Sequence, residues 1–246
     1  LREELFKYFL QSGHPETALE VADEGLKLDP YNADLYDLKS NACLFLSNFK
    51  CAVDALETMY ATDSTKADTL FFTKISAAAA EGEQPDTTRL LKWSQAGVRK
   101  YPDNPTLLGY LNRAYAMTGQ VDSVVAVTNR MISKDTTAVD QALAAAQVLI
   151  TPPAATGTRA TATGATPAAD TSAARRGRPK EALPFLEYAI RYGDAQAKEN
   201  AAALLYTGAA PLLQAPQDLA GASELLRVAV KNANPSGKVY TASNYL

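Results

Sequence analysis

The chain has 246 residues with a net charge of −3; 47% are hydrophobic and 21% charged, so most of it can bury a core. Its single histidine excludes multi-histidine metal sites, and its two cysteines exclude a four-thiolate site or a disulfide-dense scaffold. No uninterrupted apolar run approaches the length of a membrane-spanning helix, so we expect no membrane span in this segment. It begins at Leu1 rather than Met and stops at Leu246 as another helical pattern opens, which indicates a fragment of a longer protein.

Charge is distributed unevenly along the chain. Residues 1–150 carry 14 Lys and Arg against 20 Asp and Glu, whereas residues 151–246 carry 10 against 7. Neither part has the dense positive charge of a nucleic-acid surface or the acidic block of a charged tail. We therefore do not expect nucleic acid to be the main partner.

A repeat organises the first 150 residues. Successive apolar stretches end at residues spaced by 34, 38 and 34 positions: Pro30, Ser64, Pro102 and Thr136. In three units a turn residue precedes a small or β-branched residue by five positions: Gly13 and Ala18, Ser47 and Ala52, Gly119 and Val124. A fixed period of this length is the mark of a repeat architecture.

Each complete unit is expected to form two helices. Apolar residues at helical spacing predict helix pairs over 5–10 and 19–26, over 35–45 and 53–60, and over 107–115 and 124–131. Short turns join the two helices of each pair, at Gly13, at Ser47-Asn48 and at Thr118-Gly119. Helices joined in this way are expected to pack antiparallel.

The composition changes after Ile150. Residues 151–177 are rich in Ala and Thr, contain Pro152-Pro153 and lack large apolar side chains, so they cannot bury enough surface to offset their ordering entropy. We predict a disordered Ala/Thr/Pro-rich insertion there. Helical pattern resumes at Pro179 and ends at Gly193.

The insertion is expected to interrupt a fifth unit. Val124 and Ala182 are 58 positions apart, which equals one 34-residue repeat and 24 inserted residues. The first helix of this unit would span about 137–150, and the second would start after the insertion. A sixth pair is predicted at about 195–213 and 217–232, and a seventh opens at Tyr240. The alternative is two separate subdomains joined by a linker.

The repeat resembles the tetratricopeptide repeat (TPR) family. The residues that carry the resemblance are Gln11-Ser12-Gly13 through Ala18 to Leu28-Asp29-Pro30, and Leu111-Asn112-Arg113-Ala114-Tyr115 with Gly119. The family's helix-start Trp is absent from every unit, and its small first-helix residue falls on Phe6, Ser40 and Asn112. The resemblance covers residues 1–150 and, more loosely, 178–246. It implies an all-α, TPR-like α-solenoid of about six antiparallel helix pairs that form a superhelix.

The resemblance also implies a binding surface, because the first helices of TPR units line a concave groove for a partner protein or peptide. The candidate groove residues are Lys7, Gln11, Asn41, Phe45, Lys74, Arg113 and Met117. The basic and amide members could clamp a peptide carboxylate by charge-assisted hydrogen bonds. Glu3 and Asp37 interrupt such a lining, and the alternative is an ordinary solvated face.

A second motif lies at the end of the insertion. Residues 175–180 resemble the core of an AT-hook, which makes Arg176 and Arg178 candidate DNA contacts in a narrow minor groove. We favour the alternative that this segment is a basic tether ahead of a helix.

The two cysteines flank the second inter-helix turn. Cys43 and Cys51 each lie four residues from Ser47, so an antiparallel hairpin would place them at similar heights. A disulfide is geometrically allowed, although two separate small thiols are the commoner arrangement, which we favour. The compartment stays open, with a lean towards a bacterial cell envelope from the cysteine pair and the modest charge, and the insertion's composition points towards a bacterial source.

No nucleophile elbow, phosphate-binding loop or metal-ligand spacing is present in the sequence. We therefore predict a non-catalytic protein-binding or peptide-binding scaffold that needs no cofactor and no small-molecule ligand. The alternative is a regulatory or recruiting TPR segment of a larger enzyme or transcription regulator. A minor alternative is a protein tethered to DNA through the segment at 175–180.

Overall fold

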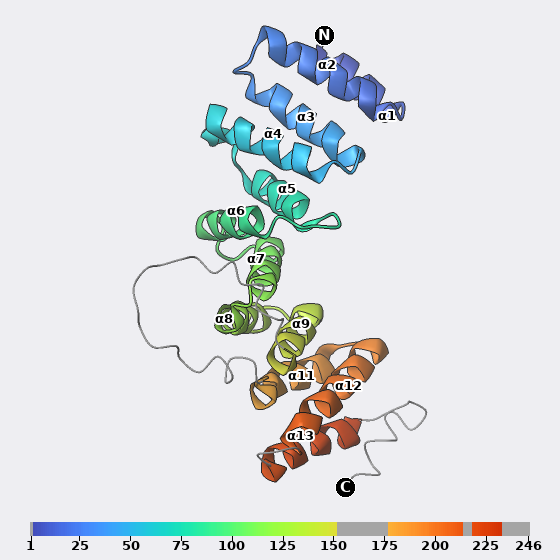
Figure 1. Ribbon diagram of the computed structural model, residues 1–246, viewed down its shortest axis with the longest axis vertical. Coiled ribbons are helices and arrows are strands. Elements are labelled where there is room, and N and C mark those ends of the chain that lie inside the picture. Colours follow the sequence, from blue (N-terminus) through green and yellow to red (C-terminus); the bar gives the residue numbers. More distant parts are fainter. Residues whose placement is uncertain (1, 152–176, 214–217, 233–246) are drawn as a thin grey trace. The chain divides into compact units, whose positions relative to one another are not determined.

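A computed structural model describes residues 2–151, 177–213 and 218–232, and this part of the chain contains helices and no strand (Figure 1). Its twelve α-helices follow one another as six pairs, which confirms the predicted all-α repeat fold. The helices are α1 (Arg2–Gln11), α2 (Pro15–Leu28), α3 (Ala33–Phe45), α4 (Phe49–Thr62), α5 (Thr69–Ala80), α6 (Thr87–Lys100), α7 (Pro105–Met117), α8 (Val121–Ile132), α9 (Val139–Ile150), α11 (Pro179–Tyr192), α12 (Ala195–Leu212) and α13 (Leu219–Asn232). A short 3₁₀ turn, η1 (Ser64–Lys66), lies between α4 and α5.

The contacts divide the chain into two compact units, Leu1–Ala114 and Tyr115–Leu246. The division falls within α7 and does not coincide with the change of composition at residue 151. Of the insertion predicted at 151–177, residues 152–176, and with them Arg176, lie outside the described residues, as does the predicted seventh unit.

Polar side chains cap the N-termini of many of the helices. An Asn or Asp oxygen accepts the backbone N–H three residues further on, and so satisfies a donor that the first helical turn leaves without a partner. The capping residues are Asn32, Asn48, Asp68, Asp86, Asn104, Asp194 and Asp218. At the other end, α2 stops directly before Asp29-Pro30, and α6 stops before Tyr101-Pro102.

The three aligned turns share one backbone conformation. Gly13 and Gly119 have φ angles of 77° and 69°, and Ser47 takes the equivalent place with φ 54°. In each turn the following N–H bonds back to a carbonyl five residues earlier, as from His14 to Phe9 and from Asn48 to Cys43. This is the helix ending in which a left-handed residue, usually Gly, closes the last turn.

Replacing Ser47 with glycine is therefore expected to stabilise the protein. A side chain in the left-handed region costs roughly 1–2 kcal/mol, and part of that gain is offset by the extra freedom of glycine in the unfolded chain. We expect Ser47→Gly to raise the free energy of unfolding by about 0.5–1 kcal/mol in urea titrations. Ser12→Gly, at an exposed turn position without positive φ, is the control and should give no gain. Equal effects of both changes would refute the assignment.

The first unit is built on small residues and aromatic rings. Phe6 packs with Ala18, Ala22 and Ala42, where α1, α2 and α3 meet. On α6, a Cβ added at Gly97 would lie only 3.0 Å from the Cβ of Phe72, so the helices approach closely at this point. Small residues at such points let the axes of two packed helices approach closely.

The second unit has one continuous core. Its buried residues come from α8, α9, α11, α12 and α13. Helix α9 packs directly against α11, so the fifth pair is formed from segments on either side of residues 152–176. The Arg178 N–H donates to the Leu149 carbonyl at 2.6 Å, and Pro179 takes the first position of α11 as its sequence predicted.

The two cysteines form a disulfide between α3 and α4. The favoured expectation of two separate thiols was therefore wrong. The turn at Ser47 brings the Cα atoms of Cys43 and Cys51 to 5.8 Å, which lies within the range that a disulfide spans.

Candidate peptide-binding surface

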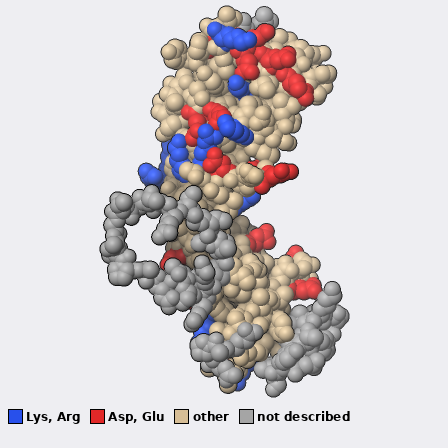
Figure 2. All heavy atoms as spheres, in the orientation of Figure 1, with Lys and Arg blue, Asp and Glu red and all other residues tan. Residues whose placement is uncertain are grey.

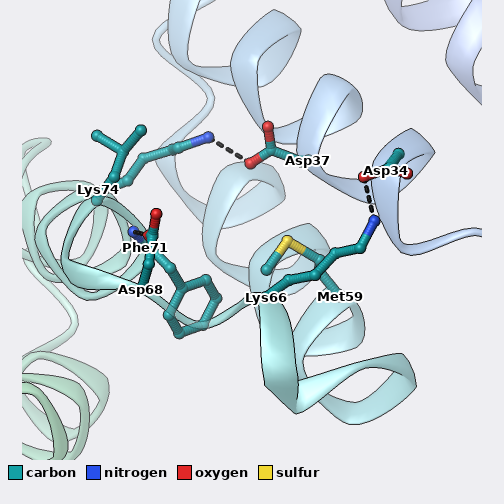
Figure 3. Close-up of a pocket in the computed structure, with 8 residues that line it drawn as sticks. Asp34, Asp37, Met59, Lys66, Asp68, Phe71 and Lys74 are labelled. Carbon is teal, nitrogen blue, oxygen red and sulfur yellow. Dashed lines mark hydrogen bonds and ion pairs between the residues drawn. The ribbon is translucent and has the colours of Figure 1, made fainter. Parts of the chain in front are cut away.

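A hollow of about 200 Å³ opens on the first unit, where α3, α4, η1 and α5 meet (Figure 3). Its wall combines carboxylates, lysine ammonium groups and apolar side chains. The residues that line it are Asp34, Asp37, Met59, Lys66, Asp68, Leu70, Phe71 and Lys74. We call this feature the α3–α5 hollow.

Two lysine–aspartate pairs cross the hollow from one repeat to the next. Lys66 of η1 pairs with Asp34 of α3, and Lys74 of α5 pairs with Asp37 of α3. The Lys74 ammonium also donates to Asn41 Oδ1 at 3.0 Å. Figure 3 shows the Lys66 side chain reaching towards Asp34 and the Lys74 side chain reaching towards Asp37.

The floor of the hollow is apolar. Met59 and Phe71 are buried, whereas Leu70 stands at the rim with 67% of its surface exposed. The Asp68 carboxylate caps α5 by accepting the Phe71 N–H at 2.8 Å, which fixes it at the edge of the hollow. An apolar floor under a polar rim suits a side chain that has an apolar stem and a polar end.

Of the groove residues predicted from the sequence, Asn41 and Lys74 are joined directly. Gln11 is exposed, Phe45 is 67% exposed, and Lys7 pairs with Glu4 of its own helix at 3.3 Å. Met117 is half-buried and belongs to the second unit.

Arg113 is engaged at the end of α5. It donates to the Ala80 carbonyl at 2.7 Å and pairs with Glu81 at 3.6 Å. A cation at this place satisfies a carbonyl that the helix end leaves without a partner. Tyr110 lies on α7, the helix that carries Arg113. Burial and the nearby charge of Glu81 raise the pKa of Tyr110, and the charge of Arg113 offsets part of this rise.

The candidate DNA contact that the structure describes is also engaged. Arg178 pairs with Asp122 at 2.8 Å and with Glu181 at 3.3 Å. At the start of α11, its guanidinium is therefore held between the carboxylate of Asp122 on α8 and that of Glu181 on α11.

Sequence reasoning missed six of the eight residues that line the hollow: Asp34, Met59, Lys66, Asp68, Leu70 and Phe71. A usable signal was present for the Lys74–Asp37 pair, because both residues lie on first helices and are 37 positions apart. Opposite charges separated by about one repeat are placed to meet on neighbouring helices of the same kind.

A second charged cluster lies on α4 and α6. Arg89 pairs with Asp54 at 2.6 Å and with Glu57 at 3.3 Å, and lies 3.6 Å from Asp86. Lys50 and Lys92 pair with Asp54 and Glu57 respectively, and Glu57 also accepts the Trp93 indole N–H. Figure 2 shows positive and negative side chains intermixed over the region of α4 to α6. The cluster joins the second helices of adjacent repeats.

This cluster is expected to make stability depend on pH. Burial alone would raise the pKa of Asp54 and Glu57, but hydrogen bonds and the charges of Arg89, Lys50 and Lys92 outweigh it and hold both pKa values below their usual range. A lowered folded-state pKa adds stability above the unfolded-state pKa, and this stability is lost as the pH falls through the folded-state pKa.

We therefore expect Arg89→Gln to destabilise the chain at pH 7, and to do so progressively less as the pH falls below about 4 and through the lowered folded-state pKa values of Asp54 and Glu57. Urea midpoints measured at pH 7, 4 and 3 check this. Lys27→Gln, an exposed change on α2, is the control. A destabilisation by Arg89→Gln that stays constant over this range would contradict the assignment.

The described residues contain neither a membrane-spanning helix nor a cluster of metal-binding side chains. None of the helices there is long and apolar enough to cross a membrane. That part of the chain also holds no group of three or more His, Cys, Asp or Glu side chains arranged to bind a metal ion.

Comparison with known proteins found likenesses among the solved structures. No family model matches the sequence, and no curated protein matches it. The chain is similar to the crystal structure of the C-terminal part of a TPR repeat-containing protein from Cytophaga hutchinsonii, with 16% identity and a TM-score of 0.37 over 99% of this chain and 98% of that one. A likeness at this level does not by itself establish a fold, so the fold described above rests on the helix pairs themselves.

Proposed function

We propose that the chain is a non-catalytic scaffold that binds a protein or peptide on the surface formed by the first helices of its pairs. The observation that carries the proposal is the α3–α5 hollow, which lies between the first helices of two adjacent repeats. It is open to solvent and has both an apolar floor and charged groups. These are the features that fix the position and orientation of a bound side chain.

Exposed apolar side chains extend this surface. Phe45 on α3 and Leu70 on α5 are each 67% exposed although both are large. Single exposed apolar residues are common on protein surfaces, but here they lie on the two first helices that border the hollow. They would supply apolar contact area to a partner that crosses α3 and α5.

A comparative pull-down tests the proposal. Phe45→Glu with Leu70→Glu changes the first-helix surface, and Leu28→Glu with Leu219→Glu makes the same chemical change at exposed positions of second helices. Lysate of the source organism is passed over the wild type and both variants, and bound proteins are identified by mass spectrometry. We expect a partner that the wild type and the second-helix variant retain and the first-helix variant loses. Identical sets of proteins on both variants, or none on the wild type, would contradict the proposal.

A further inference from the structure

We propose that the α3–α5 hollow takes the side chain of a Lys or Arg from an extended peptide, an inference that rests on the scaffold function proposed above. The first step is size. About 200 Å³ is less than the roughly 300–1,000 Å³ of typical small-molecule sites. The hollow therefore suits a single side chain of a partner better than a free metabolite.

The second step is the accessibility of the charges. The Asp34 and Asp37 side chains are 59% and 41% exposed, whereas those of their partners Lys66 and Lys74 are 37% and 13% exposed. Asp68, the third carboxylate of the hollow, is also exposed. An incoming group therefore meets carboxylate oxygens before it meets ammonium groups.

The third step is the remaining bonding capacity of these carboxylates. Each has two oxygens that can accept several hydrogen bonds, so a pair with one lysine leaves room for a second cation. A peptide carboxylate, in contrast, would have to displace Asp37 from Lys74, because Asp37 already stands where the anion would bind. The hollow thus favours a cation over the anion that a carboxylate clamp would hold.

The fourth step is the match between the hollow and a long cationic side chain. Met59 and Phe71 form an apolar floor along which the methylene stem of a Lys or Arg can lie, while its charged end reaches the rim carboxylates. Charge also favours such a peptide at longer range. The first unit carries 12 Lys and Arg against 17 Asp and Glu, so it attracts a basic segment.

The test begins with selection of binders from a displayed library of random 12-residue peptides on the whole chain. Enriched peptides are synthesised with a fluorescent label and titrated by anisotropy. We expect the enriched sequences to share a Lys or Arg. Its replacement by Ala should weaken binding to the wild type about tenfold, and raised salt should weaken binding of the parent peptide.

Variants of the hollow then locate the contact. Asp34→Asn with Asp37→Asn should weaken the parent peptide about tenfold and remove most of the further effect of the peptide's Lys-to-Ala change. Glu16→Gln with Glu20→Gln makes the same change of net charge at exposed positions of α2 and should alter binding less than twofold. If the double variant folds poorly, Asp34→Asn alone replaces it in the test. This variant changes the more exposed carboxylate and should give an intermediate loss of affinity for the parent peptide.

The outcomes separate the two proposals. Enriched peptides that share no cation, or that bind the double aspartate variant as well as the wild type, would overturn this inference and leave the scaffold function standing. Enrichment of peptides that end in acidic residues would support a carboxylate clamp instead and would also overturn it. Failure to enrich any peptide would contradict both proposals.

Discussion

Trp93→Ala is expected to destabilise the first unit by about 3–5 kcal/mol, the usual cost of removing a buried Trp side chain. Trp93 is 4% exposed, and its ring meets Tyr60 and Phe71 edge to face at centroid distances of 5.1 and 5.5 Å. It therefore joins α4, α5 and α6. The change leaves a large cavity and removes the hydrogen bond to Glu57 at 2.8 Å. Urea titration followed by far-UV circular dichroism measures the effect without relying on Trp fluorescence.

Trp93→Phe separates the ring from its N–H group. It keeps most of the aromatic packing and loses the bond to Glu57, so we expect it to cost about 1–2 kcal/mol. We expect Trp93→Ala to lower the free energy of unfolding more than Trp93→Phe does, and this order separates the packing of the ring from its hydrogen bond. A Trp93→Ala protein within 1 kcal/mol of the wild type would show that these rings do not form the core of the first unit.

Loss of the Cys43–Cys51 disulfide is expected to cost roughly 2.5 kcal/mol, because the bond closes a short loop and restricts the unfolded chain. The two cysteines are eight positions apart and tie the end of α3 to the first turn of α4. The predicted change is a lower urea midpoint for Cys43→Ala with Cys51→Ala under oxidising conditions.

A reductant supplies the matched control for this prediction. Dithiothreitol should lower the urea midpoint of the wild type towards that of the double variant and leave the variant itself unchanged. A wild-type midpoint that does not respond to dithiothreitol would show that the bond does not form or adds no stability.

Helix positions could be predicted from the sequence because their signals are local. Asp29-Pro30 stops α2 through backbone chemistry that needs no tertiary contact, and Asn48 caps α4 in the same way. The left-handed backbone conformation of Ser47 could also be predicted, because Ser47 aligns with Gly13 in the repeat. The disulfide was not predicted, because it depends on the distance between two helices, which spacing alone does not determine.

The α3–α5 hollow could be predicted only in part. Lys74 and Asn41 were identified through the family resemblance, which orders residues along first helices. Asp34 and Lys66 were missed because their meeting depends on how η1 places the chain before α5. The division of the chain within α7 has no compositional signal, because it reflects the distribution of tertiary contacts and not a local sequence feature.

Hydrogen–deuterium exchange of the whole chain, with and without a library-selected peptide, tests most directly whether the first-helix surface binds a partner. Bound peptide should slow amide exchange in α3 and in the segment from η1 to α5, and should leave α2 and α13 unchanged. The contrary result is exchange that slows only in second helices, or that does not change around the hollow while anisotropy still reports binding.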